Sequence, residues 1–393
     1  MREVFKIMFL TKEEELALSG EYGPAVQKAM EILVALGDLY NADRLIKIKS
    51  VQIAGVSYKN LGDYGIQFLR DFVEMGARVS VYTTLNPAGI GDEEFIEKQH
   101  EILELYRKMG VEITSTCTPY YGPNLPKFGD HLAWSESSAV SFANSVLGAR
   151  TNREGGPSSL AAAIVGKTPN YGLHLDENRK ATHLVVVENG LLRDTTDYSL
   201  LGYKVGEIVG DGVPYFKGLK PDVDDLKALG ASMAASGSIA LYHVEKETPE
   251  WKTAISDKIE KISIGRKELE DVKERFSTEW EDIDIILLGC PHASLKEIKR
   301  IAELLRMRNK PLKIPLFVTT SRPIKSLADY LGYTEIIERY NGKILSDVCL
   351  VVSPIKEWYS GVATNSGKAA FYFKSFGLNV RLEDTEKILM GAP

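Results

Sequence analysis

Cysteine is scarce in this chain, which contains only Cys117, Cys290 and Cys349 among 393 residues. They lie far apart in sequence, and local metal-binding signatures such as CxxC are absent. An odd number of distant cysteines is unsuited to a disulfide framework in a reducing compartment. Two interpretations follow. The cysteines are either three separate buried residues that act as small apolar side chains, or ligands gathered at one site.

The chain also lacks an excess of positive charge and any long apolar segment. Its 48 Lys and Arg are outnumbered by 54 Asp and Glu, which gives a formal net charge of −6. Nucleic acids and anionic membranes bind clustered positive charge, so we expect neither as a partner. No apolar run approaches the length of a membrane span, and we see no targeting signal. These observations predict a cytoplasmic protein, in which a local basic pocket for a small anionic substrate is still possible.

The length and the order of the expected elements predict an α/β protein with several domains. A chain of 393 residues exceeds one ordinary hydrophobic core. Strand-like and helical patterns alternate, which indicates parallel sheets with right-handed crossovers. We expect N-terminal helices and a first βα module in residues 1–128, a middle α/β domain in 129–281, and a second βα module in 282–393.

Polar loops follow the expected strands of the first module, at residues 55–60, 84–89 and 117–120. Ligands in open α/β sheets bind beyond the carboxyl ends of the strands, so these loops are candidates for a shared site. In the second module, the apolar run at 283–288 ends at Gly289 and is followed directly by Cys290. Cys349 differs, because it lies near the start of a strand predicted at 347–352.

The placement of the cysteines after strands is the argument for a metal site. Three thiolates without a fourth suit an iron–sulfur cluster that leaves one iron open. An open iron can act as a Lewis acid toward a hydroxyl or a carboxylate. A zinc ion held by the three cysteines and His292 is an equally good interpretation of the same residues. The residue types alone leave both alternatives open.

Two other segments are candidates for binding. Residues 129–157 concentrate polar side chains among Gly, Ser and Ala and contain no Lys, so we expect several of these polar groups to be buried with partners. The stretch GVATNSGKA at 361–369 is close to a P-loop, but it has one residue too many and Ala369 replaces the magnesium-binding Ser or Thr. We therefore expect a phosphate or carboxylate near Lys368 at a helix N-terminus, and no nucleotide.

The sequence resembles the aconitase X family over nearly its whole length. The motifs that carry this resemblance are GVSYKN at 55–60, TLNPAG at 84–89, CTPY at 117–120, WSESSA at 134–139, GARTNREGGP at 148–157 and GCPH at 289–292. The resemblance implies an aconitase-like α/β fold with several parallel βα modules around a central iron–sulfur site. It implies Cys117, Cys290 and Cys349 as ligands of a 4Fe-4S cluster, which can also be found as 3Fe-4S or be lost.

Within the family, the chain is most similar to the archaeal branch. That branch implies a hydro-lyase that dehydrates (R)-5-phosphomevalonate to trans-anhydromevalonate 5-phosphate in the mevalonate pathway of isoprenoid biosynthesis. The general base is expected on a small swivel-domain subunit that forms a heteromer with this chain, so no base is assigned here. The alternatives are a cis-3-hydroxy-L-proline dehydratase of the same family and a non-catalytic iron–sulfur or zinc protein.

We also predict which residues contact the substrate. The loops that face the cluster are expected to bind it, with the anionic end of the substrate near the lysine. The predicted residues are Gly55, Val56, Ser57, Asn86, Pro87, Glu136, Ser137 and Lys368.

Overall fold

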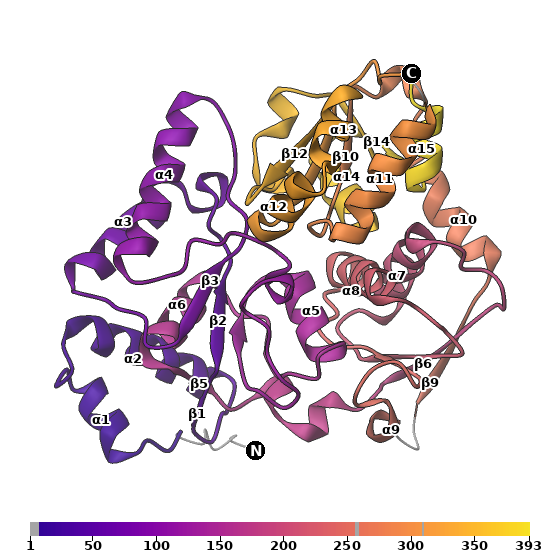
Figure 1. Ribbon diagram of the computed structural model, residues 1–393. Coiled ribbons are helices and arrows are strands. Elements are labelled where there is room, and N and C mark those ends of the chain that lie inside the picture. Colours follow the sequence, from indigo (N-terminus) through magenta and orange to yellow (C-terminus); the bar gives the residue numbers. More distant parts are fainter. Residues whose placement is uncertain (1–7, 256–258, 309) are drawn as a thin grey trace.

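The computed structural model describes residues 8–255, 259–308 and 310–393 and shows an α/β protein with three parallel sheets. The first sheet lies at the left of Figure 1, the second at the lower right and the third at the upper right. All strand pairs within these three sheets are parallel, as the alternation of strand and helix patterns predicts. A short antiparallel pair, β1 with β5, accompanies the first sheet.

The first sheet has the strand order β3-β2-β4. Side-chain caps define the helices around it: Thr11 forms a capping box with Glu14, and Asp92 accepts a hydrogen bond from the Phe95 N–H. The elements of this region are α1 (Lys12–Leu18), α2 (Pro24–Leu39), β1 (Leu45–Lys47), β2 (Ser50–Ile53), α3 (Tyr58–Glu74), β3 (Tyr82–Leu85), α4 (Glu93–Lys108), β4 (Ala133–Trp134), α5 (Ser137–Ser145), α6 (Gly156–Val165) and β5 (Lys167–Pro169).

The second sheet has the order β8-β7-β6-β9, with the long helices α7 and α8 packed along each other. Asp194 and Asp222 cap these two helices by accepting hydrogen bonds from N–H groups of the first turn. The elements are β6 (His183–Val187), α7 (Thr195–Val209), β7 (Pro214–Lys217), α8 (Val223–Gly237), β8 (His243–Val244), α9 (Trp251–Ala254), β9 (Glu260–Ile264) and α10 (Arg266–Glu274).

The third sheet has the order β12-β11-β10-β13-β14. Its central strand β10 is buried at every position, as expected for an apolar strand covered on both faces. The elements are β10 (Ile285–Leu288), α11 (Leu295–Arg308), β11 (Leu316–Thr320), α12 (Arg322–Tyr330), α13 (Tyr333–Arg339), β12 (Gly342–Ser346), β13 (Gly361–Thr364), α14 (Gly367–Ser375), β14 (Asn379–Leu382) and α15 (Thr385–Gly391).

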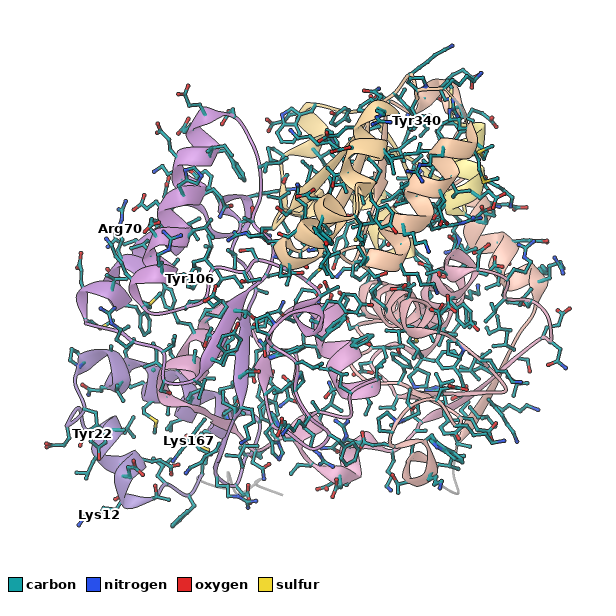
Figure 2. All side chains as sticks on the ribbon, in the orientation of Figure 1. Lys12, Tyr22, Arg70, Tyr106, Lys167 and Tyr340 are labelled. Carbon is teal, nitrogen blue, oxygen red and sulfur yellow. The ribbon has the colours of Figure 1, made fainter. Side chains whose placement is uncertain are left out.

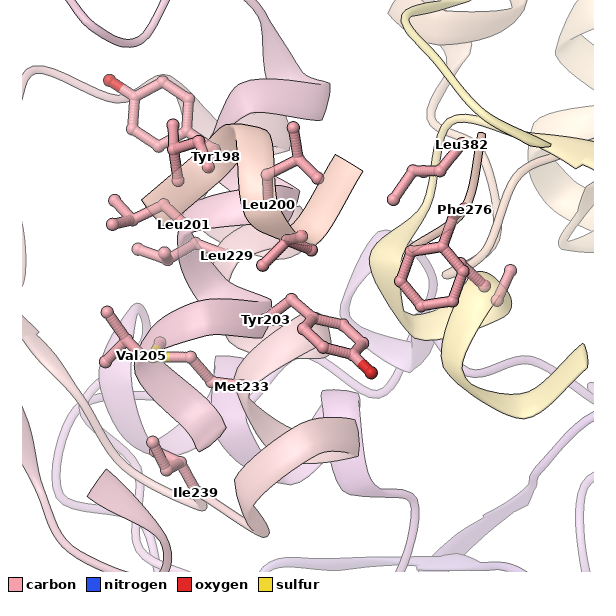
Figure 3. Packing of buried hydrophobic residues seen from close by; sticks show 14 of the residues in the cluster. Tyr198, Leu200, Leu201, Tyr203, Val205, Leu229, Met233, Ile239, Phe276 and Leu382 are labelled. Carbon is pink, nitrogen blue, oxygen red and sulfur yellow. The ribbon is translucent and has the colours of Figure 1, made fainter. Parts of the chain in front are cut away.

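One hydrophobic core joins the second and third sheets. Tyr203 of α7 meets Phe276 edge-on, with ring centroids 5.5 Å apart, and Leu382 of β14 belongs to the same cluster (Figure 3). Helix α14 packs against α7 and α8, and the Gly367 N–H donates a 2.7 Å hydrogen bond to Ser199 Oγ. This contact fixes the N-terminus of α14, the part of the helix that carries Lys368.

The strand predicted at residues 347–352 is wrong. Residues 350–352 form the 3-10 turn η5 (Leu350–Val352), and the residues before it pair with the first region instead of the third sheet. The Cys349 N–H donates to the Ala88 carbonyl at 2.9 Å, and the Ala88 N–H donates to the Asp347 carbonyl at 3.0 Å. The physical reason is that β12 already occupies the place beside β11, so these backbone groups find their partners in a loop of the first region.

The predicted domain boundaries after residues 128 and 281 stay predictions. Strand β4 follows the first of these boundaries in sequence and pairs with β2, which precedes it. Helix α6 likewise lies against α2. Residues 133–169 therefore contribute to the first sheet and to its helical cover.

Side chains of the first region show how its surface and interior differ (Figure 2). Lys12 and Tyr22 project outward, whereas Tyr106 is only 3% exposed. Lys167 ties β5 to α1 through a 2.7 Å ion pair with Glu14. Among the described residues, the helices are all too short or too polar to span a membrane. The cytoplasmic location stays a prediction.

Buried histidines predict a loss of stability in acid. His243 is fully buried and hydrogen-bonds through Nε2 to the Arg179 carbonyl at 2.9 Å. Burial lowers the pKa of His243 to about 4. The unfolded chain, with a histidine pKa of about 6.5, then binds a proton that the folded chain does not, so stability is full above that pH and falls by about 1.4 kcal/mol per pH unit below it.

We expect acidification from about pH 7 to about pH 5 to lower the melting temperature of the wild type more than that of His243→Gln. The measurement is circular dichroism against temperature at each pH. The exposed His100→Gln is the control and should keep the wild-type pH dependence. An equal pH dependence in all three proteins would contradict this prediction.

Candidate active site at the three cysteines

The three cysteines line one cavity, although they come from distant parts of the chain. The cavity has a volume of about 340 Å³, near the lower end of the range for ligand pockets. Cys117 follows the first sheet, Cys290 follows β10 of the third sheet, and Cys349 lies in the loop after β12, which is bonded to the first region. The cavity therefore lies where these two regions meet.

The first cysteine is held by the edge of the first sheet. Residues 111–116, which precede it, make a single parallel bridge between Ser115 and Leu85. The Thr116 N–H donates to the Leu85 carbonyl at 2.9 Å, and Gln52 Nε2 donates to the Thr116 carbonyl at 2.7 Å. The backbone immediately before Cys117 is therefore fixed to the sheet, and Cys117 itself is only 8% exposed.

The second cysteine follows β10, as the sequence predicts. Gly289 has a φ of 93°, and a Cβ at this position would lie 2.2 Å from the Thr319 carbonyl oxygen, so the close approach to β11 requires glycine. Thr319 Oγ1 donates to the Gly289 carbonyl at 2.6 Å. These contacts hold the turn that presents Cys290 to the cavity.

The loop of the third cysteine is held mainly by the first region. Ser57 Oγ donates to the Val352 carbonyl at 2.5 Å, and Lys59 Nζ donates to the carbonyls of Val351 at 3.2 Å and Ser353 at 3.0 Å. Together with the Ala88 contacts described above, these bonds fix the position of Cys349 relative to the first sheet.

The thiols are protonated in the absence of a ligand. Burial raises the pKa of all three, to about 12 for Cys290, and the charge of Lys368 opposes part of this rise. Metal binding requires thiolates, so binding would release protons, and the lysine would favour the thiolate form.

The arrangement fits a cluster better than a zinc ion. In the described ranges, no group of three or more His, Cys, Asp or Glu side chains is placed around a single metal position. His292, the fourth ligand of the zinc alternative, is 1% exposed and has both ring nitrogens bonded within the protein: Nδ1 to Thr116 Oγ1 and Nε2 to the Val348 carbonyl, each at 2.9 Å. Three thiols that face one cavity without converging on one point suit a larger group such as an iron–sulfur cluster.

A buried ion pair lies in the wall of the same cavity. Lys368 Nζ pairs with Glu136 Oε1, and both side chains are less than 10% exposed. Burial favours the neutral form of Glu136, but Lys368, Ser138 and the Ala139 N–H outweigh it and hold the pKa of the carboxyl below its usual value. For Lys368, burial lowers the pKa, but Glu136 and the cysteines raise it more, so the pKa lies above its usual value. Both groups are therefore charged.

Two N–H groups at the helix N-terminus around Lys368 already have protein partners. Ser366 Oγ accepts the Ala369 N–H at 3.1 Å, and the Gly367 N–H is bonded to Ser199. Since Lys368 itself pairs with Glu136, an anion here would compete with protein partners. The contact of Lys368 with an anionic group stays a prediction.

Arg153 is the cation of the cavity wall that lacks a partner among the described residues. It is exposed, whereas Lys59 is bound to two carbonyls and stacks over the Phe376 ring, with Nζ 4.1 Å from the centroid. Asn86 presents a second free group, because its buried Oδ1 has no hydrogen-bond partner in this part of the chain. A cation and an acceptor are therefore both available to a ligand.

The structure brings most of the predicted substrate residues together. Asn86, Pro87, Glu136, Ser137 and Lys368 line the cavity with the cysteines. Gly55, Val56 and Ser57 lie outside its wall, and the same loop contributes instead Ala54, Lys59 and Asn60. Ser57 supports the site indirectly, because its hydrogen bond to the Val352 carbonyl holds the loop of Cys349.

The sequence did not single out several residues of the wall. These are Lys59, Asn60, Ser135, Arg153, Tyr372 and Phe376. The first four lie within motifs that carry the family resemblance. Their position in these motifs, beside residues predicted to bind the substrate, could have identified them. Tyr372 lies one helical turn after Lys368 on α14, a spacing that places both on one face.

The dense polar segment at 129–157 has two roles. Glu136, Asn144 and Glu154 are buried and hydrogen-bonded, as its small neighbouring residues predict. Of these three, Glu136 reaches the cavity. Asn144 instead joins Thr151 to the buried Arg179, so much of this polarity supports the packing between the first and second regions.

Comparison with known proteins identifies the family of the chain. Models of the aconitase X first, second and third domains match residues 7–177, 181–274 and 283–392. A relative from Thermococcus kodakarensis, named phosphomevalonate dehydratase large subunit, is 73% identical over 387 residues, which cover 98% of this chain and all of the relative. The holo-form crystal structure of Thermococcus kodakaraensis aconitase X has a TM-score of 0.96 and 73% identity, covering 98% of this chain and 100% of that one.

A relative with another substrate in its name is more distant. The cis-3-hydroxy-L-proline dehydratase of Hypocrea jecorina is 35% identical over 389 residues, which cover 92% of this chain and 65% of that relative. All three parts of the chain match aconitase X models, and the fold is that of a solved aconitase X. The resemblance seen in the sequence is confirmed: the chain belongs to the aconitase X family.

Proposed function

We propose that this chain is the cluster-binding large subunit of a dehydratase that converts (R)-5-phosphomevalonate to trans-anhydromevalonate 5-phosphate in isoprenoid biosynthesis. The relative from Thermococcus kodakarensis, which is named for this activity, is similar over its whole length. The observation that carries the proposal is the convergence of three cysteines on one cavity that also offers an unpaired arginine.

Cys117, Cys290 and Cys349 are the proposed ligands of a 4Fe-4S cluster, which becomes 3Fe-4S when the open iron is lost. When bound, such a cluster supplies a Lewis acid for the departing hydroxyl group. The protein's own contribution is to hold the thiols in fixed loops and to limit the access of water. It also places the charge of Lys368 beside the thiolates, where it favours their ionised form.

The free groups of the wall suit the polar substrate. Arg153 is proposed to bind its phosphate or carboxylate, because a guanidinium can donate two parallel hydrogen bonds to such an anion. Asn86 Oδ1 is proposed to accept a hydrogen bond from a hydroxyl of the substrate, which would satisfy a buried acceptor that otherwise lacks a partner. Glu136 and Lys368 would orient the substrate as a pair.

The proton is proposed to be removed by a group on a small partner subunit. Glu136 is a poor candidate, since Lys368 and its other hydrogen-bond donors hold the pKa of the carboxyl below its usual value. A weakly basic carboxylate does not efficiently abstract a proton from carbon. The words "large subunit" in the name of the relative support a heteromer in which the partner supplies the base.

Turnover of phosphomevalonate is the direct test of the proposal. We expect anaerobically reconstituted large subunit, mixed with its small subunit, to dehydrate (R)-5-phosphomevalonate in preference to cis-3-hydroxy-L-proline. The product is measured by mass spectrometry and NMR. Preference for the proline substrate would favour the alternative activity in the family. Turnover of neither substrate by a cluster-loaded complex would favour a non-catalytic binding protein.

We expect Cys290→Ser to lower turnover by at least about 100-fold, since a serine hydroxyl is a poor ligand for iron in a sulfur-bound cluster. Iron and sulfide content and the visible absorbance of the anaerobic protein should fall with it. The melting temperature of the apo-protein should change little, because Ser and Cys are similar in size. Wild-type turnover in the variant would exclude the three-cysteine site.

We expect Arg153→Gln to raise KM about 10- to 100-fold, since a hydrogen bond to a charged group contributes about 1.5–3 kcal/mol. Arg153→Lys should recover part of this loss, because it keeps the charge but loses the paired donors. Arg78→Gln is the matched control, an exposed arginine outside the cavity. KM is measured by steady-state kinetics. An unchanged KM in Arg153→Gln would show that Arg153 does not bind the anionic group of the substrate.

A further inference from the structure

His292 contacts residues from all three cysteine loops. Its backbone N–H donates to Cys117 Sγ at 3.2 Å, and its ring Nδ1 lies 2.9 Å from Thr116 Oγ1 in the same loop. Ring Nε2 lies 2.9 Å from the carbonyl of Val348, the residue before Cys349. His292 itself follows Cys290 by two positions, so it belongs to the loop of the second cysteine.

The second region of the chain adds a fourth anchor. Lys227 of α8 donates from Nζ to the His292 carbonyl at 3.4 Å, and its charge is balanced by Asp224 at 3.2 Å and by Glu297. The lysine is buried, so this contact places the backbone of His292 against α8. His292 therefore connects parts of the chain that belong to three different sheets.

The hydrogen bonds of the ring have defined directions. A carbonyl oxygen can only accept, so Nε2 carries the hydrogen that is donated to Val348. Nδ1 of the neutral ring then accepts the hydroxyl hydrogen of Thr116, whose oxygen in turn accepts the Thr118 N–H at 3.0 Å. The ring is 1% exposed and fully bonded, so it holds the first and third cysteine loops at a fixed separation.

We propose that His292 is a positioning residue that locks the three cysteine loops at the spacing the cluster requires. The inference rests on the three-cysteine site of the proposed function and adds the residue that sets its geometry. The need for such a residue is physical, because the segment that carries Cys349 lies outside the strands of the third sheet and depends on contacts with loops of the first region. Residues that orient metal ligands typically change metal affinity by about 10- to 100-fold when replaced.

Four variants separate the two bonds of the ring. His292→Ala removes both. His292→Gln keeps a donor near the position of Nε2, whereas His292→Asn keeps an acceptor near the position of Nδ1. Thr116→Val removes the hydroxyl group that bonds to Nδ1, with little change in the shape of the side chain. His243→Gln is the matched control, a buried histidine that also bonds a backbone carbonyl through Nε2 but lies in the second region.

The first measurement uses the full-length apo-protein and is independent of the cluster. Each cysteine is alkylated with iodoacetamide, and its rate is followed by peptide mass spectrometry. Loss of the Val348 bond should free the third loop, so Cys349 should react at least about 10-fold faster in His292→Ala and His292→Asn. His292→Gln and His243→Gln should stay near the wild-type rate.

The second measurement uses the anaerobically reconstituted chain. Iron and sulfide are counted, and the loss of visible absorbance is timed in excess chelator. We expect the half-life of the cluster to fall about 10- to 100-fold in His292→Ala, with partial recovery in His292→Gln, and the EPR signal of the reduced cluster to broaden. Thr116→Val should shorten the half-life less than His292→Ala, because the bond to Val348 remains.

The outcomes distinguish this inference from the proposed function. Wild-type chain that takes up no iron and sulfide would overturn the proposed function, and the alkylation rates would still decide whether His292 holds the loops together. If the wild type loads its cluster while the Asn variant matches it in alkylation rate, half-life and EPR signal, His292 has no positioning role. If His292→Ala fails to fold, the comparison of Gln with Asn gives the answer.

Discussion

A buried ion pair between Glu136 and Lys368 is the interaction on which the site depends most. Glu136 is the N-cap of α5 in the first region, and Lys368 lies in the first turn of α14 in the third. A buried charge without its partner is strongly unfavourable, so the two helix ends must meet when the chain folds. Because this pair lies in the wall of the cysteine cavity, the bond that joins the two regions also sets the electrostatic surroundings of the thiols.

Contacts between different regions of the chain also hold the loops around the cavity. Ser57, Lys59 and Ala88 hold the loop of Cys349, and His292 adds the contact between this loop and that of Cys117. Most of these bonds end on backbone carbonyl or amide groups. They fix the path of the main chain, and this path determines where the thiols lie. A site built in this way requires all of its loops to be in place at once.

The division of charge in the cavity follows from that assembly. Lys59 and Lys368 serve the structure, through carbonyls and through Glu136, which leaves Arg153 as the cation open to a ligand. Lysine suits the first role because its ammonium group is compact, and arginine suits the second because its guanidinium is planar and binds an anion at two points. Among the described residues, Arg153 is therefore the one cation of this wall without a protein partner.

Local patterns in the sequence determined the α/β class, the parallel sheets and the delivery of Cys290 by a buried strand, because side-chain periodicity and turn residues act over short distances. The motifs also identified Asn86, Pro87, Glu136 and Ser137, which the structure places in the cavity wall. Sequence could not show that Lys368 is engaged by Glu136, that Ser57 supports a loop, or that His292 has no free nitrogen. The strand expected at Cys349 was wrong for the same reason: the partner of that segment is Ala88. Such pairings join residues from 56 to 295 positions apart, and only the packing of the three sheets decides them.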